Sequence, residues 1–153
     1  MGPVLLAYVG VALMVGLSGI GSAFGLTICG NAVVGAMKKA PEKMGTYIAL
    51  SALPSSQGLY GFVAYMMVQK FLVADMPWVT AAGIFGAGLI MGFAGFYSSI
   101  RQAHVCANGI AATGAGHNVF AATMVMAVFP ELYAILALVV SILISFTFPA
   151  VAA

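Results

Sequence analysis

One carboxylate lies in the middle of a long apolar stretch near the end of the chain. Between His117 and Phe148, Glu131 is the only acid, and there is no lysine or arginine. The stretch exceeds the roughly 20 apolar residues that cross a bilayer. An ionisable group at the bilayer centre costs about 2.5–3.5 kcal/mol on insertion scales and is rarely retained without a use. Glu131 is therefore a candidate ion-carrying group, the alternative being a structural carboxylate hydrogen-bonded between helices.

Polar side chains from two other apolar segments are expected at the depth of Glu131. Gln57, Gln102 and Glu131 each lie 12–15 residues from the nearest charged or glycine-rich loop. On helices that rise 1.5 Å per residue, this places all three roughly 18–23 Å from those loops. Ser56 adds a hydroxyl beside Gln57, and Tyr60 lies about one turn further along the same helix face. These groups predict an oxygen-rich pocket around one negative charge, as a hard monovalent cation needs in place of its water shell.

The composition of the chain indicates an integral membrane protein. Of 153 residues, 63% are hydrophobic and only 5% are charged, and the formal net charge is +2. Soluble domains carry about 25% charged residues. So small a positive charge does not suggest a nucleic-acid partner. Cys29 and Cys106 are too few for a disulfide framework, and their apolar surroundings predict buried thiols. The N-terminus lacks the basic region of a cleavable signal peptide.

Four long apolar segments must position these side chains, and each is expected to be a transmembrane helix. None shows the period-two alternation of a lipid-facing strand. Pro54, within the second segment, removes one backbone hydrogen bond and disturbs the carbonyls before it. The expected spans are residues 4–37, 44–73, 78–112 and 117–148, and the third loop is expected to be a turn of small residues at 113–116.

The four segments form an internal repeat. Gly16-Leu17-Ser18-Gly19 in the first segment matches Gly92-Phe93-Ala94-Gly95 in the third, at an offset of 76 residues. Gly58-Leu59-Tyr60 in the second matches Glu131-Leu132-Tyr133 in the fourth, at an offset of 73. The fold class expected is therefore an all-α membrane protein of two duplicated helical hairpins, residues 1–75 and 76–153. Only the second hairpin carries the ion carboxylate, because Gly58 stands at the equivalent position of the first.

Small residues are concentrated in the first and third segments. Glycine lets helix backbones approach closely, so these two segments suit the tight inner wall of a ring with the other two outside. An ordinary four-helix membrane bundle also uses glycine, and glycine content alone leaves the two arrangements about equal. The residues concerned are Gly16, Gly19, Gly21, Ser22 and Gly25 in the first segment and Gly83, Gly86, Gly88, Gly92 and Gly95 in the third.

The distribution of lysines predicts the orientation in the membrane. Three lysines lie in the first loop, residues 38–43, whereas Lys70 is the only basic residue near the second. The positive-inside bias then places loops 38–43 and 113–117 in the cytoplasm and both termini outside. His104 and His117 are isolated and are expected near the cytoplasmic boundary. No Gly-Lys-Ser/Thr phosphate loop occurs, so ATP chemistry is expected elsewhere in any assembly.

The motifs of three segments together resemble the K subunit of V/A-type rotary ATPases, the duplicated proteolipid of the membrane rotor ring. The resemblance covers essentially the whole chain and rests on Leu53-Pro54-Ser55-Ser56-Gln57-Gly58-Leu59-Tyr60-Gly61-Phe62, on Gln102, and on Glu131-Leu132-Tyr133-Ala134-Ile135-Leu136. Resemblance to the sodium-translocating members implies a metal site in this chain. Its ligands would be the Leu53 carbonyl, the Ser56 hydroxyl, the amides of Gln57 and Gln102, and Glu131. Tyr60 would hold the Glu131 carboxylate by a hydrogen bond.

The sequence departs from the family pattern at three positions. Ser56 stands where a threonine is familiar, but the hydroxyl is retained. Pro130 directly precedes Glu131 and could shift the backbone that carries the carboxylate. Arg101, next to Gln102, is unexpected at this depth. It is about 100° round the helix from Gln102, so the preferred interpretation is an arginine that turns away, into a ring lumen, and snorkels or meets phospholipid. The other interpretation is a direct influence on Glu131.

The resemblance implies a transport subunit that does not itself catalyse ATP hydrolysis. Its expected partners are further copies in a ring, a stator a/I-type membrane subunit whose arginine competes for Glu131, a central-stalk subunit at the cytoplasmic loops, and lipid. The expected location is a prokaryotic plasma membrane. Sodium is favoured over the proton, since a proton site has no use for two amides and a hydroxyl at one depth. Two other classes remain, a proton-coupled small four-helix exporter and a channel or scaffold tetraspan.

Overall fold

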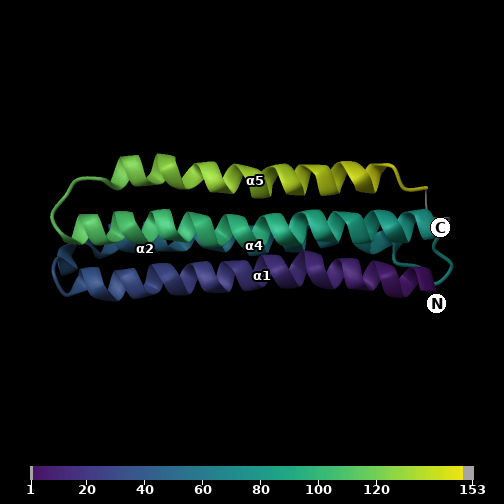
Figure 1. The fold of residues 1–153 in the computed structure, drawn as a ribbon, viewed down its shortest axis with the longest axis horizontal. Helices are drawn as coiled ribbons and strands as arrows, with labels where there is room; N and C mark the ends of the chain where they lie inside the picture. The colour runs from purple at the N-terminus through teal and green to yellow at the C-terminus, as the bar shows by residue number, and fades with distance from the viewer. Residues whose placement is uncertain (1, 150–153) are drawn as a thin grey trace.

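Long helices run side by side along one axis of the molecule (Figure 1). The structure is a computed structural model that describes residues 2–149. In that part the chain makes four helical passages. The elements are α1 (Gly2–Met37), η1 (Pro41–Lys43), α2 (Met44–Ala52), η2 (Leu53–Ser55), α3 (Ser56–Val68), η3 (Gln69–Phe71), α4 (Trp78–Gly114) and α5 (Phe120–Phe146), where η denotes a 3-10 helix. The all-helical class expected from the sequence is confirmed for the described residues.

Three of these helices, α1, α4 and α5, are long and apolar enough to cross a membrane. The second expected span, 44–73, is not one α-helix: it runs from Met44 to Phe71 and is interrupted by η2. Pro54 is the physical reason, because it has no backbone N–H to bond the preceding turn. The chain tightens there into a 3-10 turn and then continues as α3.

The expected loops need small corrections. The third loop does not begin at Thr113, because α4 continues through Gly114. The turn that follows contains Gly116 with φ of 97°, a left-handed conformation that glycine adopts without steric cost. The fourth expected span starts later, at Phe120. The last residues of the expected second hairpin, 150–153, lie outside the described part, as does Met1.

The helices α1 and α4 approach each other closely, because glycine backbones meet there. A Cβ atom built on Gly10 would lie 2.6 Å from the Phe85 Cα, and one on Gly21 would lie 2.6 Å from the Phe96 Cα. A Cβ on Gly88 would overlap the backbone of Gly10. Only a missing side chain permits such an approach. Gly21 and Gly88 were expected to pack closely from the sequence and do so, whereas Gly16, Gly19 and Gly86 of the same expected set meet no atom within 4 Å.

Two apolar clusters fill the bundle, one toward each end. Ile84 and Met91 lie in the cluster toward the chain termini, and Leu50 and Ile110 lie in the one toward the α1–α2 and α4–α5 loops. Between the clusters, near the middle of the bundle, lie buried polar side chains. These are Ser18, Ser22, Gln57, Ser98, Ser99 and Gln102.

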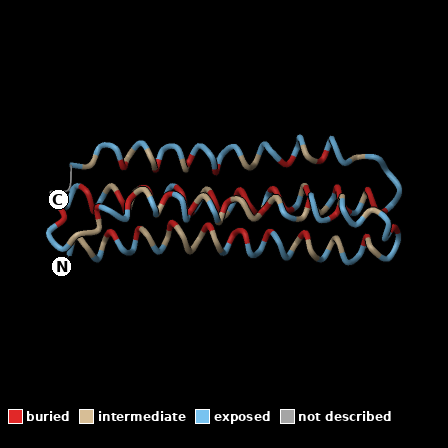
Figure 2. The backbone as a smooth tube through the Cα atoms, turned by 180° about the vertical axis from the view of Figure 1, so that it is seen from behind, coloured by how far each residue is buried: buried red, intermediate tan, exposed pale blue. Residues whose placement is uncertain are grey.

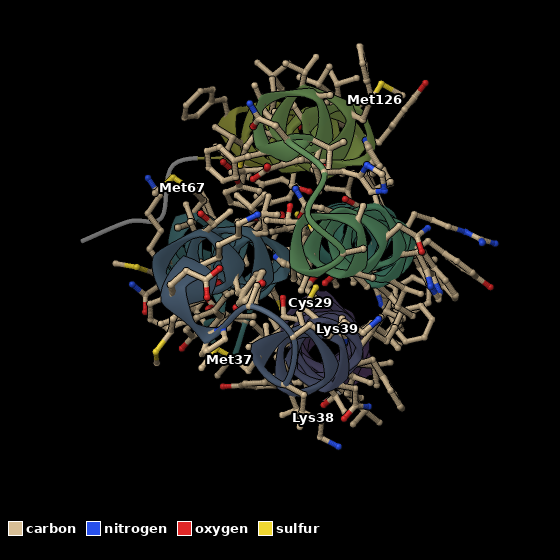
Figure 3. All side chains as sticks on the ribbon, turned by 90° about the vertical axis from the view of Figure 1, so that its left-hand side faces the viewer. Cys29, Met37, Lys38, Lys39, Met67 and Met126 are labelled. Carbon is tan, nitrogen blue, oxygen red and sulfur yellow. The ribbon has the colours of Figure 1, made fainter. Side chains whose placement is uncertain are left out.

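The outer surface exposes many large apolar side chains, and they are frequent along α5. Figure 2 shows α5 mostly in the exposed colour, whereas buried positions recur along α1 and α4. Viewed from the loop end, Met67 and Met126 point outward, while Cys29 points into the bundle (Figure 3). Both thiols are buried, as the sequence predicted. So much exposed apolar surface suits contact with lipid or with further protein chains.

Candidate ion-binding site

Three helices converge on the Glu131 carboxylate. From α3, the Ser56 hydroxyl and the Tyr60 hydroxyl each donate a hydrogen bond to Oε1, both at 2.7 Å. From α4, the Gln102 side-chain amide donates to Oε2 at 2.9 Å. The expected meeting of these four side chains is therefore present in the structure. Glu131 is half-buried on α5, as are Ser56 and Tyr60 on α3, whereas Gln102 is fully buried.

Gln57 is linked to the carboxylate through Gln102, and the two glutamines form a hydrogen-bonded network of amides. Gln57 Nε2 donates to Gln102 Oε1 at 2.9 Å and to the Ser98 hydroxyl at 3.2 Å. Gln102 is oriented further by a 3.0 Å bond from its Nε2 to the Ala127 carbonyl. Both glutamines are fully buried. Their orientation is set from two sides, which is how a buried polar network fixes a single geometry.

One oxygen of this network has no partner. Gln57 Oε1 is buried and accepts no hydrogen bond within the described part of the chain. Buried polar atoms are nearly always satisfied, and an exception is explained by strain, an ordered water or a bound ion. The Thr80 and Thr113 hydroxyl oxygens, outside this network, are also without a partner in the described part. An unpartnered amide oxygen in the same hydrogen-bonded network as a carboxylate is a ligand that a small cation can use. The residues present therefore fit a monovalent cation.

The backbone at η2 contributes another oxygen. The Leu53 carbonyl lies 3.1 Å from the Ser56 hydroxyl. That hydroxyl has a single proton and can donate to Leu53 or to Glu131, but not to both at once. The region therefore contains more acceptors than donors. The Ser99 hydroxyl donates to the Pro54 carbonyl at 2.8 Å, which ties this 3-10 turn to α4 and fixes its carbonyls in place.

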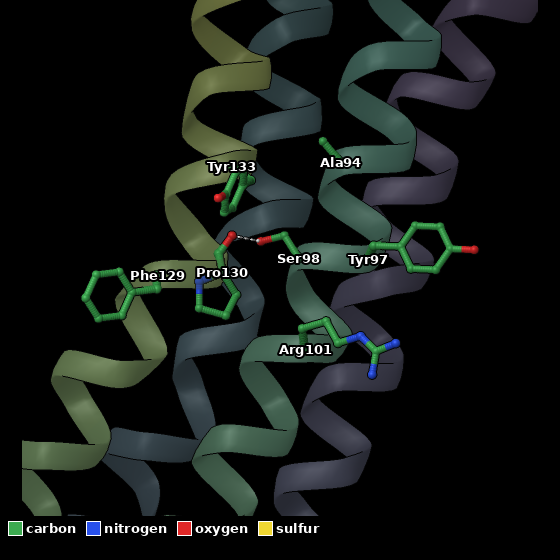
Figure 4. Close-up of a pocket in the computed structure, with 7 residues that line it drawn as sticks. All are labelled: Ala94, Tyr97, Ser98, Arg101, Phe129, Pro130 and Tyr133. Carbon is green, nitrogen blue, oxygen red and sulfur yellow. Dashed lines mark hydrogen bonds between the residues drawn. The ribbon is translucent and has the colours of Figure 1, made fainter.

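Two of the departures from the family pattern, Pro130 on α5 and Arg101 on α4, line one cavity. Pro130 stays within α5, and its carbonyl accepts a 2.8 Å bond from the Ser98 hydroxyl (Figure 4). Glu131 is within hydrogen-bonding distance of Ser56 and Gln102 despite this proline. Arg101 is exposed, and in Figure 4 its side chain extends away from α5. The geometry agrees with an arginine that turns away from Gln102.

Two members of the site were not expected from the sequence. One is Ser98, although it lies four residues before Gln102 and hence on the same helix face, a spacing that could have pointed to it. The other is the Ala127 carbonyl, for which the sequence holds no signal. The histidines do not enter the site, since His104 and His117 are exposed. Among residues 2–149, no three His, Cys, Asp or Glu side chains are grouped as metal ligands.

The family model for the C subunit of ATP synthase matches this chain twice, over residues 9–68 and 85–144. The chain belongs to the family of ATP synthase C subunits. The double match confirms the internal duplication, and the recognition of a duplicated K-subunit proteolipid from the sequence is likewise confirmed. Together with the apolar helices, membership in this family makes the chain an integral membrane protein.

Curated relatives in this family serve both V-type and A-type ATPases. The A-type ATP synthase subunit K of Methanocaldococcus jannaschii is 37% identical over 142 residues, which are 93% of this chain and 62% of that protein. The V-type sodium ATPase subunit K of Enterococcus hirae is 36% identical over 94% of this chain and 92% of its own length. The c″ subunit of the V-type proton ATPase of Saccharomyces cerevisiae is 26% identical over 94% of this chain and 71% of that protein.

Proposed function

We propose that this chain is the membrane rotor-ring subunit of a V/A-type ATPase and carries one sodium ion per copy at Glu131. The observation that carries the proposal is the Glu131 carboxylate held by donors from two helices, with the unpartnered Gln57 Oε1 in the same network through Gln102. The alignment of 93–94% of this chain with subunits K of A- and V-type enzymes supports the same assignment.

The four passages would span the membrane as two hairpins, residues 1–75 and 76–153, with α1 and α4 lining the inside of the ring. Glu131 then lies near mid-membrane on an outer helix. A bound cation neutralises the carboxylate, which lowers the cost of exposing the site to lipid as the ring turns. At a stator subunit, the ion leaves Glu131 for an aqueous path and another takes its place. Repeated around the ring, this exchange couples ion flow to rotation.

Sodium is favoured over the proton because of the number of oxygens around the carboxylate. A protonated Glu131 would need only one acceptor for its new hydrogen. The cation must replace several water oxygens at once, and the chain offers Gln57 Oε1 together with the Leu53 carbonyl, the Ser56 hydroxyl and Gln102 Oε1. Relatives named for sodium and for proton transport both exist, so the preference for sodium rests on the chemistry of the site.

The test of ion identity is protection of Glu131 from a carboxyl-modifying carbodiimide. The reagent attacks the protonated acid, so we expect added sodium at constant pH to slow modification in a saturable way, while potassium at the same ionic strength does not. Modification is measured by mass spectrometry of the peptide that contains Glu131. A labelling rate that follows pH and is unaffected by sodium would make this a proton ring.

The proposed orientation places the lysine-rich end of the bundle in the cytoplasm. Lys38 and Lys39 lie at the end where Lys43 Nζ donates to the Thr113 carbonyl at 3.1 Å, so loops 38–43 and 113–117 share one side. In sealed membranes, we expect a Lys39→Cys variant to react with an impermeant maleimide from the cytoplasmic side only. Reaction from the outer side would invert the orientation and move the central-stalk contacts to the opposite end.

A further inference from the structure

Two prolines interrupt the second and fourth helical passages beside the ion-binding site, and adjacent serines of α4 bond to both of them. The Ser99 hydroxyl donates to the Pro54 carbonyl at 2.8 Å. The Ser98 hydroxyl donates to the Pro130 carbonyl, also at 2.8 Å (Figure 4). Both serines are buried. One helix therefore holds the two ligand-bearing passages at the points where their own backbone hydrogen bonding is broken.

The 3-10 turn η2 is held on its α1 side as well. Gly58 is the third residue of α3, and the first N–H groups of a helix have no acceptor within that helix. The Gly58 N–H donates instead to the Ser22 hydroxyl of α1 at 2.8 Å. A Cβ on Gly25 would lie 2.6 Å from the Pro54 Cβ and 2.7 Å from the Ser99 Oγ. The turn is therefore enclosed between α1 and α4.

The broken part of α5 is positioned by α4 in a similar way. Pro130 has no backbone N–H, so the carbonyl four residues earlier loses its helical hydrogen bond. Two side chains of α4 supply contacts around this break, because Gln102 Nε2 donates to the Ala127 carbonyl at 3.0 Å and Ser98 donates to Pro130. These two side chains are four residues apart and share one helix face. The backbone that carries Glu131 is thus attached to α4 on both sides of the proline.

Each serine acts one residue away from a group of the ion-binding site. The Leu53 carbonyl comes directly before Pro54, and Glu131 comes directly after Pro130. Because Ser98 and Ser99 are adjacent on one α-helix, the distance between the two attachment points is set by the geometry of α4. That distance limits how far the Leu53 carbonyl and the Glu131 carboxylate can move apart. A site whose ligands are held at a fixed separation can select a cation by its size.

We infer, on the basis of the proposed function, that Ser98 and Ser99 are positioning residues that determine which alkali cation the site accepts. They hold η2 and α5 at a separation that suits sodium, although neither serine is itself a ligand. Losing either attachment lets η2 or α5 move outward, and the enlarged site then admits the larger potassium ion. The two serines therefore act on the ratio of sodium to potassium binding more than on sodium binding alone.

Ser99→Ala tests the attachment of η2, because it deprives the Pro54 carbonyl of its donor from α4. The measured quantities are the sodium and potassium concentrations that give half-maximal protection of Glu131 from carbodiimide at constant pH. We expect the potassium-to-sodium ratio of these concentrations to fall roughly two- to tenfold, as the loss of one hydrogen bond allows. Ser141→Ala is the control. Ser141 is also a buried serine that donates to a backbone carbonyl, that of Ala137, at 2.8 Å, and its variant should keep the parental ratio.

The attachment of α5 can be tested with a pair of side chains of equal shape. Ser98 lines a cavity of about 420 Å³ between α4 and α5, which leaves room for a branched side chain. Threonine keeps the hydroxyl and valine replaces it by a methyl group, so any crowding is the same in both variants. We expect Ser98→Thr to keep the parental potassium-to-sodium ratio and Ser98→Val to lower it. Equal ratios in the two variants would overturn the role of the Ser98 hydroxyl.

A substitution on α1 tests the position of η2 without removing a hydroxyl. In Gly25→Ala the new methyl group would press on Pro54 and Ser99, so we expect a lowered potassium-to-sodium ratio. Gly30→Ala is the matched control, because a Cβ on Gly30 of the same helix would meet no atom within 4 Å. Helix content by circular dichroism and the mass of the detergent-extracted assembly should match the parent for every variant that is compared.

The same titrations separate failure of this role from failure of the proposed function. If sodium does not protect Glu131 in the parent protein, sodium carriage is refuted, and the role of the serines in selecting sodium is refuted with it. If sodium protects the parent, but the variants change both half-protecting concentrations by the same factor or leave both unchanged, the serines have a structural role only. Their role in selectivity would then be overturned, and the proposed function would stand.

Discussion

A ring carrying Glu131→Gln is expected to assemble normally and to transport no ions. Glutamine keeps the size of the side chain and can still hydrogen-bond to Ser56, Tyr60 and Gln102. It lacks the negative charge that attracts the cation and then exchanges it, and within the span of α5 there is no other acid to take over. Ion uptake into reconstituted vesicles should fall to the background of empty vesicles, and ATP hydrolysis coupled to it should stop.

Glu42→Gln is the appropriate control, since Glu42 is an exposed acid in η1 and plays no part in the site. This variant should transport at the parent rate. Equal assembly of both variants, measured as the mass of the detergent-extracted ring, would show that the loss is chemical and not structural. Undiminished transport by Glu131→Gln would refute the assignment of this residue as the ion carrier.

Gln57→Leu is expected to weaken sodium binding strongly while leaving Glu131 in place. The substitution removes the unpartnered oxygen Oε1 and also deprives Gln102 Oε1 of its donor. Losing one polar interaction with a charged ligand costs about 1.5–3 kcal/mol, which corresponds to a roughly 10- to 150-fold loss of affinity. The measured quantity is the sodium concentration that gives half-maximal protection of Glu131 from carbodiimide.

The same substitution at an exposed amide controls for the change of side chain. Gln69 lies in η3 near the far end of the bundle and is exposed, so Gln69→Leu should leave the protection curve unchanged. If Gln57→Leu also left it unchanged, Gln57 would be a hydrogen-bond support and not a ligand. Transport by Gln57→Leu should persist at high sodium, because the carboxylate is intact.

The class of the protein and most of the site could be predicted from the amino-acid sequence. A charge content of 5% indicates a membrane protein and not a soluble domain, and a lone acid in an apolar span makes Glu131 the candidate ion-carrying group. Counting residues from the loops was enough to bring Gln57 and Gln102 to the same depth, because a helix has a fixed rise per residue. The internal repeat could be recognised in the sequence, since the two halves of the chain keep small residues at corresponding positions.

Which atoms meet and which surfaces remain open became evident from the packing of the helices. Helical periodicity gives depth and face, but the distance between two helices depends on the side chains between them, so the bond from Gln102 to the Ala127 carbonyl had no signal in the sequence. The unpartnered Gln57 Oε1 could be recognised only once every neighbouring donor was placed. The same holds for glycines. Gly16 and Gly92 occupy corresponding positions in the sequence, but Gly16 has open space beside it, whereas Gly92 lies against the α1 backbone. The difference arises because the burial of a glycine depends on which helix packs beside it.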